Sequence, residues 1–196
     1  MLNITPEQNK ATGELVDLVA AKVGNNRAIH PETAISTSAR LAGSFLLRSF
    51  NFKLDGFAPG SVLLSDEANE KGPMLVNTLA AFLSASNLSM DQAKLGGQQD
   101  QRGKAPHLDI LDSLTQIQSD AIKIAERNGL TMEQAAQSAA LATAFIVKEC
   151  SPQIGVETGF NVAVFGFIEG SKTVPPGIAI TSQPSTASKP WYKFWQ

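Results

Sequence analysis

Three short stretches of this chain carry the same helix-starting pattern, which constrains the fold more than any other feature. In TPEQ (5–8), SMDQ (89–92) and TMEQ (131–134), a hydroxyl residue is followed two positions on by an acid and then by glutamine. A hydroxyl at the N-cap accepts a hydrogen bond from an early backbone N–H, the acid complements the helix dipole, and the glutamine reaches back to the cap. The pattern predicts a helix start at each of these places.

Prolines and apolar stripes indicate further helices. Proline is favoured at the first helical position because the N–H there has no partner in the helix, and it occurs before helix-compatible runs at Pro31, Pro73, Pro106 and Pro152. Apolar residues then recur every three or four positions, as on one face of an amphipathic helix. The clearest stripe holds Ile110, Leu114, Ile117, Ala121 and Ile124, and a second one holds Ala135, Ala139, Ala142 and Ile146.

These signals predict an all-α fold: a single irregular or orthogonal bundle of about six helices with an extended C-terminal arm. The helical domain is expected to cover 1–173, and a Pro/Ser/Thr-rich tail, too poor in apolar residues to fold alone, covers 174–196. Only GIAIT (177–181) resembles a strand, and short turns are expected at 66–71 and 90–95. The expected helices are 6–23, 31–52, 73–86, 106–128, 132–150 and 153–171.

The last predicted helix is the one we place at the centre of the bundle. Its apolar residues cover more than one face, so Phe160, Val164 and Phe167 should be nearly fully buried. Small residues spaced four apart let another helix approach closely, and the preceding alanine-rich helix is the expected neighbour. The glycines at this spacing are Gly155 and Gly159, then Gly166 and Gly170.

Charge and composition exclude some function classes. Only 17% of the residues are charged, against about 25% in a typical soluble protein. Two interpretations stay open: a neutral polar surface, or a surface partly buried in an assembly. The net charge is −2 and no basic run occurs, so we expect no nucleic-acid partner, because phosphate contacts need a basic face.

The sequence also predicts a compartment. Its first residues lack the basic and apolar regions of a secretory signal, and its most apolar segment, 154–170, is interrupted by Glu157 and Asn161. A membrane partner is therefore not expected. The single cysteine, Cys150, excludes an intrachain disulfide. We expect a cytoplasmic protein.

The aromatic C-terminus is the predicted partner-binding site. Both tryptophans and the single tyrosine of the chain lie in its last residues, ASKPWYKFWQ (187–196). Aromatic side chains dominate interface energetics, and four of them in water would favour aggregation. We therefore expect this segment to dock on its own bundle, on a second copy, on another protein or on a membrane surface. The predicted partner-binding residues are Trp191, Tyr192, Phe194 and Trp195.

The remaining candidates for site chemistry are weaker. His30 and His107 each lie next to a proline at an expected helix start, and neither has a metal-ligand partner at the usual spacing. We interpret the acids Asp66, Glu67 and Glu70 as the first turn of a short helix capped by Ser65. Arg40 and Arg48 share one helix and could bind an anion, although the exposed face of that helix is the interpretation that we favour. Cys150 is expected to be a buried, inert thiol.

The sequence thus favours a non-enzymatic interaction or assembly subunit, with a protein partner or a homo-oligomer. We expect such a subunit to dock partners or copies through its helical surfaces and the aromatic tail. No catalytic motif, cofactor signature or metal-binding spacing is found in it. The alternative is a small-molecule-binding or catalytic helical protein with a pocket near His30 or His107.

Overall fold

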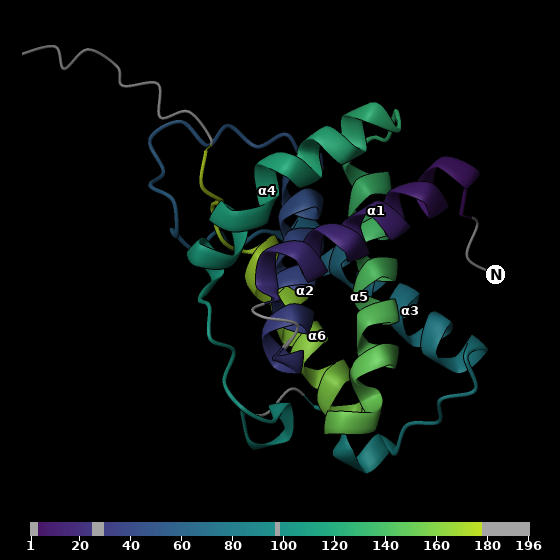
Figure 1. The fold of residues 1–196 in the computed structure, drawn as a ribbon. Coiled ribbons are helices and arrows are strands. Elements are labelled where there is room, and N and C mark those ends of the chain that lie inside the picture. Colours follow the sequence, from purple (N-terminus) through teal and green to yellow (C-terminus); the bar gives the residue numbers. More distant parts are fainter. Residues whose placement is uncertain (1–3, 25–29, 97–98, 178–196) are drawn as a thin grey trace, which may run out of the picture.

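The fold is a bundle of six α-helices, seen in a computed structural model that describes residues 4–24, 30–96 and 99–177. Helices make up 72% of these residues and no strand occurs among them, which confirms the predicted all-α bundle (Figure 1). The helices are α1 (Pro6–Val23), α2 (Pro31–Ser49), α3 (Asp66–Ala85), α4 (Ile110–Arg127), α5 (Met132–Ile154) and α6 (Val156–Ser171), with short 3₁₀ helices η1 (Gln92–Lys94) and η2 (Gln99–Arg102). GIAIT extends beyond the described residues.

Helix α2, not α6, occupies the centre of the bundle. Every residue from Glu32 to Leu47 in α2 is buried, and the other five helices all pack against it. By contrast, Phe165 and Ile168 of α6 are partly exposed and Val164 is only half-buried, whereas Phe160 and Phe167 are buried as expected. The prediction of a central last helix was therefore wrong: its several apolar faces include one that is left partly uncovered.

Three glycines bring α2 and α6 into backbone contact, and we call them the glycine seam: Gly43, Gly166 and Gly170. A methyl group on Gly43 would lie 2.5 Å from the carbonyl oxygen of Phe167, and one on Gly170 would overlap the backbone carbonyl of Arg40. The predicted close approach is thus confirmed, but its main neighbour is α2 rather than α5. Only Gly159 faces α5, where a methyl group would lie 2.9 Å from Val147.

The two predicted apolar stripes pack as expected. In α4, the residues of the stripe are buried except for the half-buried Ile110, and all four stripe residues of α5 are buried. Helices α1 and α5 also begin where the capping pattern predicts. In both, the hydroxyl of Thr5 or Thr131 accepts from the backbone N–H of Gln8 or Gln134, and the glutamine side chain bonds back to the threonine N–H.

Five helix boundaries differ from the prediction by three or more residues, at the end of α2, the starts of α3, α4 and α6, and the end of α5. Ser65 caps α3, so this helix begins at Asp66 and contains Pro73 instead of starting there. Asp109 caps α4, which moves its start past Pro106. Helix α5 continues through Pro152 to Ile154, and α2 ends at Ser49. The break between α5 and α6 is Gly155, whose φ of 82° and ψ of 149° suit only glycine.

The chain after α6 is held against the loop before α3. Residues Val62 and Thr173 form an isolated antiparallel bridge. Around it, the N–H groups of Leu63 and Gly60 donate to the carbonyls of Lys172 and Val174 over 2.7 and 2.8 Å. The side chain of Gln118 on α4 donates to the carbonyl of Pro176 over 2.7 Å. These bonds fix the point at which the described chain ends, beside α4 (Figure 1).

Candidate functional site

The predicted partner-binding residues, Trp191, Tyr192, Phe194 and Trp195, lie outside the described residues. The site that the structure does describe is therefore the surface that such a segment could occupy, together with the polar groups that the bundle brings together.

A groove runs along the surface between α1 and α5, and we call it the α1–α5 groove. It consists of two adjoining hollows of about 730 and 330 Å³. Val16 and Phe145 line both hollows, which makes the groove continuous, and Phe145 keeps 38% of its surface exposed. The larger hollow also contains Ile4, Pro6, Phe82 and Leu141, and the smaller one contains Val19, Ala34, Ile146 and Cys150.

Acidic residues line both parts of the groove. Asp17 lies in the larger hollow and Glu149 in the smaller one. A cation, Lys148, places its ammonium 6.0 Å from the centre of the Phe145 ring. An apolar floor with acidic residues suits a ligand that combines apolar side chains with positive charge.

Cys150 contributes an inert thiol to this groove. It is half-buried, and burial raises its pKa, helped by the negative charges of Glu149 and Glu32. A thiol with a raised pKa is mostly protonated near neutral pH and reacts slowly. This agrees with the expected inert role, although the side chain is less buried than predicted.

The two histidines meet at the N-terminus of α2, which sequence spacing alone did not indicate. The rings of His30 and His107 stack with their centres 3.9 Å apart. The hydroxyl of Thr33 links them, since it accepts from the His107 backbone N–H over 2.9 Å and lies 2.9 Å from His30 Nδ1. Burial lowers the His30 pKa, against the opposing effect of the nearby Glu32 carboxylate. The sequence prediction of two separate helix starts was incomplete, because a loop brings one histidine onto the other.

Glu32 is the buried carboxylate of this cluster. One of its oxygens accepts from the backbone N–H of Lys104 over 2.9 Å, and the other lies 3.5 Å from His30 Nε2. Within the described ranges, no three His, Cys, Asp or Glu side chains lie close enough together to hold a metal ion. The hydrogen bonds of Lys104 to Glu32 and of His107 to Thr33 join the 103–107 loop to the start of α2.

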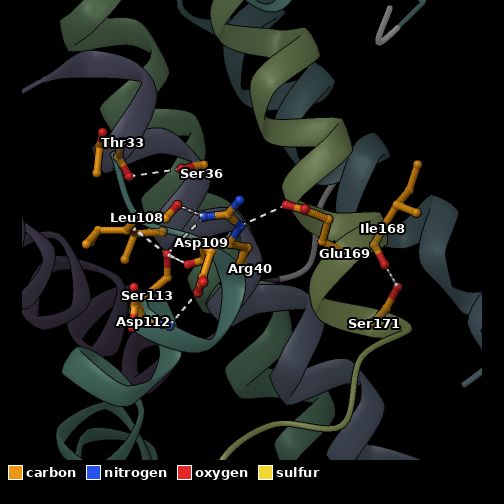
Figure 2. Close-up of polar contacts among 11 residues, drawn as sticks. Thr33, Ser36, Arg40, Leu108, Asp109, Asp112, Ser113, Ile168, Glu169 and Ser171 are labelled. Carbon is orange, nitrogen blue, oxygen red and sulfur yellow. Dashed lines mark hydrogen bonds and ion pairs between the residues drawn. The ribbon is translucent and has the colours of Figure 1, made fainter. Parts of the chain in front are cut away.

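Arg40 is buried in the middle of α2, so placing it on an exposed helix face was wrong. Figure 2 shows its guanidinium between α6 and the start of α4. Its Nε donates to Glu169 over 2.8 Å, and its Nη1 donates to the carbonyl of Leu108 over 2.7 Å and to the hydroxyl of Ser113 over 2.9 Å. A buried charge needs such partners, because desolvation would otherwise cost several kcal/mol. Arg48 lies in the last turn of the same helix and is also mostly buried, and burial lowers its pKa.

Two serines of α2 are paired with distant helices. Ser38 lies 2.8 Å from the hydroxyl of Thr143 on α5, and Ser44 donates to Gln118 on α4 over 3.0 Å. These partners lie far away in sequence, and no spacing rule could have identified them. The acids near α3 behave partly as expected: Ser65 caps the helix, and Asp66 and Glu67 stand in its first turn, but Glu70 lies beyond that turn and the helix is 20 residues long instead of short.

No protein-family model, curated protein or solved structure matches this chain. Among the described residues, no helix is both long and apolar enough to cross a lipid bilayer. Function is therefore inferred from the groove and the polar groups themselves.

Proposed function

We propose that this chain is a non-enzymatic assembly subunit whose α1–α5 groove binds the aromatic C-terminal segment of a second copy. The single observation that supports this proposal is the groove: a continuous, largely apolar depression with a partly exposed phenylalanine at its middle. Binding sites for small ligands and side-chain anchors typically have volumes of ~300–1,000 Å³, and each hollow falls in that range.

The C-terminal segment has the chemistry that the groove would recognise. Each large aromatic ring removes ~150–250 Å² from water when it docks, and the segment 191–195 carries four of them. Lys189 and Lys193 alternate with these rings. Their charge complements Asp17 and Glu149, and such complementarity favours the correct register of a bound peptide.

A second copy is the proposed source because of where the described chain ends. Its last residues are bonded to Gln118 on α4. In Figure 1 that end lies at the left, whereas α1 begins at the right, near the hollow that contains Ile4 and Pro6. We therefore place the docked segment in the groove of a neighbouring molecule.

Tryptophan fluorescence of the full chain tests the proposal, because Trp191 and Trp195 are its only indoles. We expect a blue-shifted emission that moves to the red on dilution, in step with a halving of the molecular mass by light scattering. Replacing Phe145→Glu should produce the red-shifted emission and the lower mass at all concentrations, since it puts a charge in the groove floor.

Phe57→Glu is the matched control, because Phe57 has a similar exposed fraction of 44% and does not line the groove. It should leave emission and mass unchanged. A blue-shifted emission that persists on dilution would show docking on the same chain instead. An emission like that of free tryptophan at high protein concentration would overturn the proposal altogether.

A further inference from the structure

A second, smaller hollow lies apart from the groove, between α2, α6 and the loop after η2. Its volume is about 110 Å³. Three of the residues around it are cations, one from α2 and two from the end of η2 and the loop after it, and none is an acid. The lining residues are Ser36, Arg40, Arg102, Lys104, Pro106, Val162 and Phe165.

The cations around this hollow are held in place by the fold. Arg40 is 5% exposed and fixed by its three hydrogen bonds. The guanidinium of Arg102 lies over the Phe165 ring, 3.7 Å from its centre. The backbone of Lys104 is tied to Glu32. A cluster of positioned cations with apolar walls concentrates positive potential, because the walls exclude part of the screening water.

One nearby carboxylate pairs with a lining cation, and another contacts the backbone of the loop. Glu169 binds Arg40 Nε, and Glu32 accepts from the Lys104 backbone and lies near His30. Lys104 forms no ion pair with any residue that the structure describes. The charge of Lys104 is thus not neutralised by an ion pair within the described residues.

Arg40 has donor capacity left. Its Nε and Nη1 are used, whereas its Nη2 forms no hydrogen bond with residues in the described ranges. Figure 2 shows one nitrogen of this guanidinium without a dashed contact. Guanidinium groups bind phosphate oxygens with two parallel N–H donors, and lysine adds a mobile point charge.

We propose that this hollow binds a phosphoryl group, either as inorganic phosphate or as the end of a phosphomonoester. Arg40 supplies a fixed donor at the base, while Arg102 and Lys104 supply charge from the loop side. The hollow is small, about 110 Å³, which suits one phosphoryl group and leaves the rest of a larger ligand outside it. This site is independent of the proposed docking groove.

Calorimetric titration of the full chain with sodium phosphate and with phenyl phosphate tests the site, with sodium chloride at matched ionic strength as the blank. We expect saturable one-to-one binding of both phosphates and none of chloride. Equal affinities would assign the site to the free anion, and tighter binding of phenyl phosphate would assign it to a phosphomonoester. Heats that match the chloride blank would overturn the proposal.

Two variants locate the binding. Lys104→Gln should weaken phosphate affinity about tenfold, the size expected for losing one charge-assisted contact. Lys94→Gln, an exposed lysine paired with Asp91 outside the hollow, should leave the affinity unchanged. Arg40→Lys should abolish binding, provided that its circular dichroism remains helical. Because Lys104 is exposed, its variant keeps the test decisive even if the Arg40 variant does not fold. Unchanged phosphate affinity in Lys104→Gln would place any binding elsewhere.

Discussion

The glycine seam and the α1–α5 groove show two helix pairs of one bundle that pack to different degrees. At the seam, α2 and α6 approach until backbone meets backbone, and no room remains for a methyl group. Along the groove, α1 and α5 are joined by hydrogen bonds of Gln8 and Thr12 to α5 but leave a partly exposed phenylalanine and two open hollows. The first arrangement fixes the bundle, and the second leaves apolar surface for something else to cover.

The largest expected effect comes from breaking the seam. Gly170→Ala places a methyl group against the backbone of Arg40, where no side chain can rotate away. We expect a loss of at least ~3 kcal/mol in the free energy of unfolding, above the usual ~1–3 kcal/mol for overpacking, or failure to fold. Urea denaturation followed by circular dichroism measures it.

Gly13→Ala is the control for this change on the groove side. Gly13 lies in α1 with nothing near its would-be methyl group. Alanine is the better helix former there, so stability should rise by up to ~1 kcal/mol. If the two variants lost similar stability, the seam would not be the tight contact described above.

The next largest effect is a difference in stability loss between phenylalanines of α6 and the phenylalanine of the α1–α5 groove. Phe160→Ala and Phe167→Ala remove buried rings of α6, 9% and 2% exposed, and each should cost ~3–5 kcal/mol. Phe145→Ala removes a ring that is partly exposed in the groove, so the loss should stay below ~2 kcal/mol. Chemical denaturation gives the three values. A cost for Phe145→Ala as large as that for Phe167→Ala would mean that the groove floor is part of the core.

The smallest effect is the pH dependence of stability that arises at the N-terminus of α2. This helix end includes Pro31, which lines the smaller hollow of the groove. The His30 pKa is lowered by burial and by the charges of His107 and Lys104, against the effect of Glu32. The unfolded chain therefore binds a proton more readily, and stability should fall as the pH drops below ~6.5. His30→Asn keeps a capping side chain and removes this titration. Denaturation between about pH 7.5 and 5.5 should show a shallower pH dependence in the variant; an equal slope would contradict the assignment to His30.

Local rules predicted the elements whose signals are local. Helix α1 matched its predicted bounds because Thr5 and Gln8 form a complete capping box. At α3 the sequence predicted Ser65 as the cap of a short helix and a second helix start at Pro73, whereas one helix runs from Asp66 through Pro73 to Ala85. At SMDQ, Asp91 rather than Ser89 caps, and only the 3₁₀ helix η1 follows.

The site was less predictable because its determinants are distant in sequence. The run STSAR (36–40) in α2 was interpreted as a solvent-exposed helix face. In the structure, Ser38 and Arg40 instead form hydrogen bonds with residues of α5, α4 and α6. Burial of a polar residue depends on those partners, and a single sequence does not reveal them. The groove could not be predicted from the sequence either. It arises where residues of α1 and α5 are left uncovered by other helices, and no sequence motif specifies this.

The glycine seam also has a consequence for the order in which the chain is made. Synthesis proceeds from the N-terminus, so α2 exists long before α6, from which roughly 100 residues separate it. During that interval the most deeply buried helix of the bundle has no partner for its glycine face, and contacts over such separations form slowly. A nascent chain that stops before residue 156 therefore leaves Gly43 and its neighbours open to water, to chaperones and to other unfinished chains.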